Sequence, residues 1–363
     1  MEQDRGPQHA AGAAPGPELS RFDQALLAEL QDRFPVAVAP FSVVARSLVA
    51  DERDVVARAV ALHDAGILRQ ISPIFEAEAL GYASCLVAMR VPPERLDVAA
   101  MVVNAHPGVT HNYLRAHAFN LWFTIAVPPG SDLQAHVEAL RELAGAESAR
   151  SLPALRRFKI GVSLDVTGGR GMQHRSAPRH TGGAHQTAAV PEPLTERDIE
   201  VIRTVQGDLP LRSDPFADAA RTLGMTEAEV VESLDDLRRR GALRRIAGIL
   251  RHRDAGFTAN GMAVWNVPDD RAAAVGEAMA GYTAISHCYE RPRYDDWPYN
   301  VFTMVHARST AEVDAFVEQL AKTYGIADHA VLYSTREFKK IRAVYFTPDV
   351  AEWERRFIRR DVA

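Results

Sequence analysis

Two short stretches of the sequence place imidazole, phenol and guanidinium groups at alternate positions. We call them the first row, His111, Tyr113 and Arg115, and the second row, His287, Tyr289 and Arg291. Alternate side chains of a β-strand lie on the same face, so each row would line one face of a strand. Such a face offers an acid/base group, a hydrogen-bond donor and a cation to a ligand.

The rows belong to an internal repeat. His287 follows His111 by 176 positions, and the stretch Gly66–Ile71 returns as Gly241–Ile246. Such a repeat indicates a duplicated chain. The two copies share the polar residues of one face, whereas a repeat kept only for packing would share apolar residues. The rows therefore predict a ligand site, and a surface that meets a partner subunit is the alternative.

Further polar and aromatic residues complete the candidate site. The catalytic candidates are His111 and His287, because imidazole titrates near neutral pH, and His117, which the alternation adds to the first row. The substrate-binding candidates beyond the two rows are Asn120, Trp122, Arg293, Trp297, Asn300, Lys159 and Lys339. An aromatic ring beside an amide suits a flat ligand with polar edges. Core packing is the alternative for Trp122, and solvent exposure is the alternative for the two lysines.

The elements that position these residues follow the same order in both copies. Each copy begins with a helix-turn-helix pattern, and in the second copy Gly224 ends a short helix and Thr226 caps the next one. Strand and helix periodicities then follow in the ferredoxin-like order βαββαβ. In the first copy we expect strands at 84–91, 109–115, 119–127 and 152–164, with helices near 93–104 and 132–143.

The chain is therefore predicted to be an α+β protein of two tandem halves. Residues 167–193 are rich in Gly, Ala, Pro and His, which is typical of a flexible linker. The loop 291–299 is longer than its counterpart in the first copy, and we interpret it as a lid. The predicted domains are a disordered N-terminus (1–20), a helix-turn-helix domain (21–72), a ferredoxin-like domain (73–166), the linker (167–193), a second helix-turn-helix domain (194–247), a second ferredoxin-like domain (248–348) and a C-terminal tail (349–363).

Composition excludes several classes of function. The net charge of -5 and the pI near 6.2 give no general attraction for nucleic acid or anionic lipid. No apolar run approaches membrane-spanning length, and Cys85 and Cys288 lie far apart, as expected of buried thiols in the cytoplasm. The sequence shows no phosphate-binding glycine loop, pyridoxal lysine motif or metal-cluster spacing, so we expect that no cofactor is required.

The helix-turn-helix pattern is also found in DNA-binding proteins, in which the second helix enters the major groove. That helix needs basic residues around its N-terminal end to meet the phosphates. Here it carries Glu227 and Glu229 in the second copy, and its counterpart begins with Asp51 and Glu52. We therefore predict that DNA is not a partner.

These features resemble the Lrp/AsnC architecture, in which a winged-helix-like helix-turn-helix domain precedes a ferredoxin-like ligand domain. The stretches 111–124 and 287–300 are more specifically similar to the paired subunits of sirohaem decarboxylases, and the duplicated chain resembles their fused NirDL-type form. The resemblance covers nearly the whole of each half. It implies an enzyme that removes carbon dioxide from two acetate side chains of sirohaem, on rings C and D, in haem d1 biosynthesis.

The resemblance also implies roles for the residues. Sirohaem would be the substrate, and its carboxylates and flat faces suit the arginines and aromatic rings of the site. A histidine of a row would protonate the new methyl group, and His111 or His117 could instead ligate the iron. The halves would pair as a pseudo-dimer with one working pocket where they meet. Which half supplies more of that pocket stays open, as do further dimerisation, other haem d1 biosynthesis proteins as partners, and whether the product leads to haem d1 or to haem. A regulator of the Lrp/AsnC type and a non-catalytic tetrapyrrole-binding protein are the alternative functions.

Overall fold

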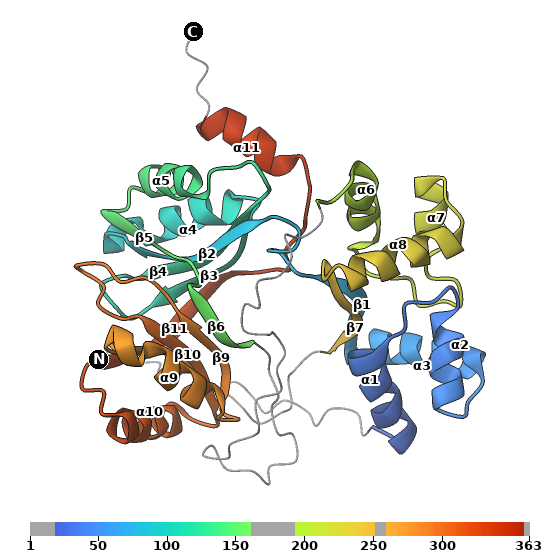
Figure 1. Cartoon of the computed structure of the whole chain (residues 1–363), viewed down its shortest axis with the longest axis horizontal. Coiled ribbons are helices and arrows are strands. Elements are labelled where there is room, and N and C mark those ends of the chain that lie inside the picture. The colour runs from blue at the N-terminus through green and yellow to red at the C-terminus, as the bar shows by residue number, and fades with distance from the viewer. Residues whose placement is uncertain (1–18, 161–192, 251–258, 359–363) are drawn as a thin grey trace, which may run out of the picture.

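The computed structural model describes residues 19–160, 193–250 and 259–358. They form two bodies, one with the helices of both helix-turn-helix units and the other with most of the strands between pairs of helices (Figure 1). The predicted disordered N-terminus and the predicted linker lie outside the described residues, except at positions 19, 20 and 193.

Local sequence explains where the helices of the first body begin and end. The side chain of Thr226 accepts a hydrogen bond from the backbone of Glu229, whose carboxylate bonds back to Thr226, and Gly224 takes the left-handed conformation that ends the preceding helix. The apolar faces of both units form one shared core. Both predicted helix-turn-helix units are confirmed. The helices are α1 (Arg21–Arg33), α2 (Pro40–Ser47) and α3 (Glu52–Asp64) in the first half, and α6 (Glu196–Val205), α7 (Ala217–Leu223) and α8 (Glu227–Arg239) in the second.

A two-stranded ribbon joins the two units. Its strands are β1 (Leu68–Phe75) and β7 (Leu243–Leu250), which pair antiparallel. Gly66 and Gly241 precede them with φ angles of 72° and 77°, a conformation that glycine adopts without strain. The strand that follows each of these glycines thus pairs with its counterpart in the other half.

The second body contains the two predicted ferredoxin-like domains, and their βαββαβ order is confirmed. Its strands carry alternating faces, one packed on helices and one directed away from them. The first domain consists of β2 (Ala83–Arg90), the short 3-10 helix η1 (Pro93–Arg95), α4 (Leu96–Ala105), β3 (Val109–Arg115), β4 (Leu121–Val127), α5 (Leu133–Ala144) and β5 (Ser148–Leu152). The second consists of β8 (Ala259–Trp265), α9 (Asp269–Ala280), β9 (Ile285–Glu290), β10 (Val301–Ala307), α10 (Thr310–Tyr324) and β11 (His329–Lys340).

The final strands of the two halves are exchanged. The single strand expected at 152–164 is confirmed only in part, and residues 161–164 lie outside the described residues. Strand β5 precedes it and ends at Leu152, before Pro153, which has no backbone N–H to donate to a strand ladder. The chain resumes as β6 (Arg156–Ile160), which pairs with β9 of the second half. In return, the end of β11 pairs with β3 of the first half. The order β5-β2-β4-β3-β11-β8-β10-β9-β6 is therefore continuous through both halves, so the predicted pseudo-dimer is confirmed.

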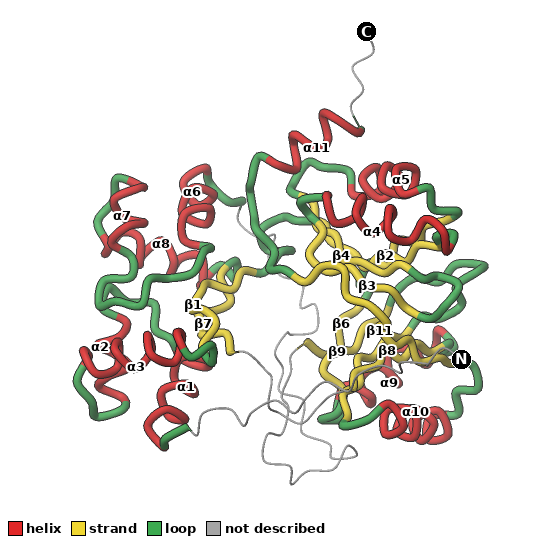
Figure 2. The backbone as a smooth tube through the Cα atoms, turned by 180° about the vertical axis from the view of Figure 1, so that it is seen from behind, coloured by secondary structure: helices red, strands yellow, loops and turns green. Residues whose placement is uncertain are grey.

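The faces directed away from the helices share a core. Helices α4 and α5 cover the strands of the first half and α9 and α10 cover those of the second, with the strands between the two pairs of helices (Figure 2). Residues of both halves, among them Trp122, Leu152, Trp297 and Phe302, form a single buried cluster where the halves meet. The segment predicted as a C-terminal tail contains helix α11 (Asp349–Phe357), which packs on the core of the first domain through Trp353. None of the described helices is long and apolar enough to cross a membrane.

Candidate functional site

Each row lies where the two halves meet. The neighbouring side chains point toward the helices: Asn112 donates a hydrogen bond to Asn104 of α4, and Cys288 contacts the carbonyl of Gly276 in α9. The row side chains alternate with Asn112 and Cys288 along the strands. They therefore lie on the face directed away from the helices, as predicted. Strand β3 pairs with the exchanged end of β11, and β9 pairs with β6, so each row lies at a seam between the halves.

The two row arginines are buried and cross between the halves. Arg115, 7% exposed, donates to the carbonyl of Leu332, and Arg291 donates to the carbonyl of Leu152. The Nε atoms of both are buried with no hydrogen-bond partner in the described part of the chain. Burial lowers the pKa of each guanidinium to about 10, so both remain charged at neutral pH.

Neither guanidinium is paired with a carboxylate among the residues that the structure describes. A buried charge without a counter-charge is costly, and several kcal/mol per ion is typical. Arg115 and Arg291 stay charged although their burial is unfavourable. An anionic ligand that forms an ion pair with each guanidinium would offset this cost.

The row tyrosines lie beside these cations. The guanidinium of Arg291 is 4.6 Å from the ring centre of Tyr289, and that of Arg115 is 5.8 Å from the ring centre of Tyr113. Burial raises the pKa of both phenols, so they stay protonated and can donate hydrogen bonds. The residue that lies opposite the tyrosine on the neighbouring strand differs between the two seams. It is Glu337 for Tyr113 and Arg157 for Tyr289.

The row histidines are neutral in the ligand-free protein. Burial lowers the pKa of His111, and it lowers that of His287 to about 4, with smaller contributions from His306 and Lys159. Both rings are therefore neutral at neutral pH, which corrects the expectation that they titrate there. A bound carboxylate close to either ring would raise its pKa again.

Sequence reasoning missed the hydroxyl groups that orient these two rings. The Nδ1 atom of His111 is 3.0 Å from the hydroxyl of Thr110, and that of His287 is 2.8 Å from the hydroxyl of Ser286. A shift of strand register falls at Thr110 and again at Ser286, as in a β-bulge, which brings neighbouring side chains together. A signal was present, because both hydroxyl residues precede their histidine at the same repeat offset.

His117 does not continue the first row. Strand β3 ends at Arg115, and His117 lies in the following turn, where its Nδ1 accepts a hydrogen bond from the backbone of Phe119. Its ring is stacked on Phe119 and meets the edge of Trp297, at 6.3 and 5.4 Å between ring centres. The alternation was extended past the end of the strand, and the geometry argues against a catalytic role beside His111.

The two predicted asparagines clamp the backbone. The amide of Asn120 accepts from the nitrogen of Val91 and donates to its carbonyl, and Asn300 makes the same pair of bonds with Val267. These bonds, 2.8–3.0 Å long, fix the end of the neighbouring strand in each half. Their conservation between the copies therefore has a structural explanation rather than the predicted substrate contact.

The two predicted lysines close the C-terminal ends of helices. Lys339 donates to the carbonyl of Asn104 at the end of α4, and Lys159 donates to the carbonyl of Tyr282, two residues past the end of α9. Burial lowers the pKa of both amines. A cation is favourable at a helix C-terminus, so these lysines stabilise the fold on the face away from the rows.

The loop 291–299 is anchored rather than lid-like. The carboxylate of Asp296 pairs with Arg150 at 2.8 Å, and the hydroxyl of Tyr294 donates to the carbonyl of Ser151, both in the first half. Arg293 bonds to Asp269 and to backbone carbonyls, which leaves it no evident role in binding. The indoles of Trp122 and Trp297 are buried in the core between the two halves. The Nε1 of Trp122 donates to the carbonyl of Phe119, so packing explains this residue, whereas the Nε1 of Trp297 is buried with no hydrogen-bond partner in the described part of the chain.

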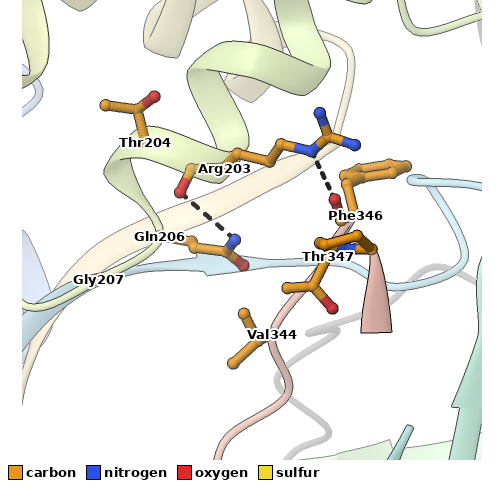
Figure 3. Close-up of a pocket in the computed structure, with 8 residues that line it drawn as sticks. Arg203, Thr204, Gln206, Gly207, Val344, Phe346 and Thr347 are labelled. Atoms are coloured by element: carbon orange, nitrogen blue, oxygen red, sulfur yellow. Dashed lines mark hydrogen bonds between the residues drawn. The ribbon is translucent and has the colours of Figure 1, made fainter. Parts of the chain in front are cut away.

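Two open pockets lie away from the rows. One, of about 530 Å³, is formed by Arg203, Gln206, Val344, Phe346 and their neighbours beside α6 (Figure 3). The other, of about 350 Å³, lies over α4 near Met101. Neither is lined by a row residue, and no cluster of metal-ligating side chains occurs within the described ranges.

The fold and the paired rows define a duplicated ligand-binding protein of the AsnC type. Residues 79–159 and 254–339 match the family model of the AsnC-like ligand binding domain, and residues 23–69 and 198–244 match that of the siroheme decarboxylase NirDL-like HTH domain. The chain belongs to the sirohaem decarboxylase family.

Close relatives span the whole duplicated unit. The siroheme decarboxylase of Hydrogenobacter thermophilus is 38% identical over 93% of this chain and 99% of its own. The siroheme decarboxylase NirDL subunit of Paracoccus denitrificans is 34% identical over 89% of this chain and 96% of its own. The crystal structure of the siroheme decarboxylase NirDL in complex with an iron-uroporphyrin III analogue is 34% identical, with a TM-score of 0.77 over 93% of this chain and 99% of that one.

Proposed function

We propose that this chain removes carbon dioxide from the acetate side chains of rings C and D of sirohaem, giving 12,18-didecarboxysirohaem for haem d1 biosynthesis. The observation that carries the proposal is the pair of buried guanidiniums, Arg115 and Arg291, which have no carboxylate partner among the described residues. The relatives are siroheme decarboxylases, and a related NirDL structure contains an iron-uroporphyrin III analogue. Both support a carboxylate-rich iron tetrapyrrole as the anion that pairs with these arginines.

The arginines would hold the substrate by its carboxylates. Each guanidinium uses one Nη donor on a backbone carbonyl of the other half, which fixes its plane and leaves its Nε donor for a ligand. A planar guanidinium in a fixed orientation pairs well with a carboxylate. The phenols of Tyr113 and Tyr289 are protonated and lie beside them, so they can donate to the same rim of the substrate.

The reaction breaks the bond between an acetate methylene and its carboxylate. Carbon dioxide leaves, the electron pair stays on the methylene carbon and spreads into the macrocycle, and a proton converts that carbon into a methyl group. His111 and His287 are the groups that we assign to this proton transfer, because each ring is oriented through Nδ1 and keeps Nε2 for the substrate. The conjugated substrate takes up the electron pair itself, so the reaction as proposed needs no cofactor.

The helix-turn-helix units would serve the fold rather than DNA. The basic residues at the end of α8 are all ion-paired: Arg238 with Asp235, and Arg239 with Asp236. Arg240 pairs with Asp198 of α6 at 2.8 Å. Because these cations are neutralised and the first turn of α8 is acidic, a DNA phosphate would meet little positive charge.

The test is to incubate the purified protein anaerobically with sirohaem and to follow the mass of the tetrapyrrole. Loss of two carbon dioxide units supports the proposal. Changing His111→Ala or His287→Ala should abolish turnover in at least one case without unfolding, while His63→Ala, on the exposed face of α3, serves as a matched control.

Two other outcomes would replace the proposal. A shifted absorption band with an unchanged mass would indicate a tetrapyrrole-binding protein without catalysis. Retardation of bulk DNA at low salt, together with no mass change, would instead favour a ligand-sensing regulator.

A further inference from the structure

The second row is connected to a third polar side chain that the first row lacks. The hydroxyl of Ser286 is 2.8 Å from Nδ1 of His287 and 2.6 Å from Nε2 of His306 on strand β10. Ser286 is 2% exposed, whereas the ring of His306 is only partly buried. A chain of imidazole, hydroxyl and imidazole thus runs from the row toward a group with access to solvent.

A hydroxyl between two imidazoles can pass a proton. It donates one hydrogen bond and accepts another at the same time, so a proton can enter on one side while another leaves on the other. The register shift at Ser286 places this hydroxyl beside His287 rather than on the opposite face of the strand.

The first row ends differently. Thr110, the counterpart of Ser286, contacts Nδ1 of His111, but its second partner is the hydroxyl of Thr124 at 2.8 Å. Burial lowers the pKa of His306, so its ring is neutral, but an imidazole can take a proton at one nitrogen while it releases one at the other. The weakly basic hydroxyl of Thr124 does not take a proton from water in this way. The two copies therefore share the orienting hydroxyl and differ in what lies behind it.

We propose, building on the decarboxylase function above, that His306 supplies protons to His287 through Ser286, and that the second row therefore delivers the proton to the substrate carbon. As the bond to the departing carboxylate breaks, the methylene carbon takes the proton from Nε2 of His287. The proton of Ser286 moves to Nδ1 of His287, and the proton on Nε2 of His306 moves to Ser286. As His306 gives up this proton, its Nδ1 takes one from water, so the ring stays neutral and one solvent proton is consumed for each carbon dioxide released.

This relay leaves His287 neutral, with its proton on Nδ1 instead of Nε2. Before the next transfer the protons shift back along the same three groups: water protonates Nε2 of His287, Nδ1 returns its proton to Ser286, Ser286 returns one to Nε2 of His306, and Nδ1 of His306 releases one to water. A buried imidazole in the second seam need not carry a positive charge at any stable point of the cycle, which fits its desolvated position. His306 acts only through the other two groups, so it is a positioning residue rather than a catalytic one.

The test compares variants in the anaerobic sirohaem assay, with binding followed separately by absorption titration. We expect Ser286→Ala to lower kcat on the order of tenfold or more with little change in the dissociation constant of sirohaem. Ser286→Thr, which introduces the residue found in the first half, should restore most of the turnover. We expect His306→Ala to show the same loss, and added imidazole should recover activity in this variant but not in Ser286→Ala.

The outcomes separate the relay from the function on which it rests. If the unaltered protein leaves the mass of sirohaem unchanged, the decarboxylase proposal itself fails. If the unaltered protein turns over and Ser286→Ala keeps its kcat, the relay is refuted while the function stands. Loss of sirohaem binding in Ser286→Ala, or failure of Ser286→Thr to recover turnover, would also refute the relay. Either result would show that Ser286 serves the packing of the site. Should His306→Ala not fold, the two Ser286 variants decide.

Discussion

Helix α11 is held on the first ferredoxin-like domain by a chain of two buried histidines and a carboxylate. The backbone N–H of Gly108 donates to Nδ1 of His106, so Nε2 of His106 carries the proton and donates to Nδ1 of His136 at 2.8 Å. Nε2 of His136 then donates to Glu354 of α11 at 2.9 Å. Trp353 covers both rings, with its centre 4.4 Å from that of His106. This network predicts that docking of α11 depends on pH.

The pKa of His106 determines whether docking of α11 weakens or strengthens as the pH falls. Burial, together with the nearby His136 and Lys339, lowers it from 6.5 to about 3. When α11 leaves, His106 becomes exposed and binds a proton below its ordinary pKa, whereas in the docked state it stays neutral until about pH 3. Docking is therefore strongest above pH 6.5 and weakens as the pH falls below that value. Between about pH 7.5 and pH 5.0 the change amounts to about 2 kcal/mol, or about 30-fold in the undocked population.

The assay is amide hydrogen exchange of residues 349–357 at both pH values. His106→Gln is the matched control, because a glutamine amide can take the place of the Nε2 donor and does not titrate. The ratio of protection in the unaltered protein to that in the variant cancels the intrinsic dependence of exchange on pH. We expect this ratio to fall about 30-fold on acidification. An unchanged ratio would refute the conclusion that docking of α11 requires a neutral His106.

Three further changes test the roles assigned to row and non-row residues. Arg291→Met should weaken sirohaem binding about 10- to 100-fold, the loss of one charge-assisted hydrogen bond, without lowering the melting temperature. Asn300→Ala should lower the free energy of unfolding by about 1 to 2 kcal/mol in denaturant titrations, because it leaves the buried N–H of Val267 without a partner while Arg293 still bonds to the carbonyl, and sirohaem binding should not change. Lys339→Met should cost about 1 kcal/mol of stability by the same measurement, with sirohaem affinity retained.

The internal repeat allowed the sequence to predict most of the fold. Helix starts at Asp51 and Thr226 depend on local capping chemistry, and the strand order depends on alternation and length, so both could be predicted without long-range information. The exchange of β6 and of the end of β11 could not, because pairing with the other half leaves no local pattern. Helix α11 was missed for a related reason: its docking depends on His106 and His136, more than two hundred residues earlier in the chain.

The site was predicted only in part, since a repeat preserves structural residues as well as binding residues. Asn120 and Lys159 recur in both copies for backbone and helix-end contacts, which sequence comparison alone cannot distinguish from ligand contacts. The row arginines differ from Asn120 and Lys159 in their hydrogen bonding, which only the structure reveals. The Nε donors of Arg115 and Arg291 are buried and unused in the described part of the chain, whereas both polar atoms of the Asn120 amide are bonded.

Differences between the copies follow from what covers each one. The pair His106 and His136 corresponds in the second copy to Tyr282 and Phe316, whose rings meet edge to face at 5.5 Å. The polar pair occurs where the carboxylate of Glu354 arrives, and β11 leads into α11 on the first half because its exchanged end pairs with β3. The hydroxyl of Tyr282 accepts a hydrogen bond from Tyr324 at 3.4 Å, so the polar group at this position has a partner in each copy. At position 306 the second copy has an imidazole bonded to Ser286 where the repeat offset of 180 places Ala126 in the first copy, and the proposed proton relay would account for this difference.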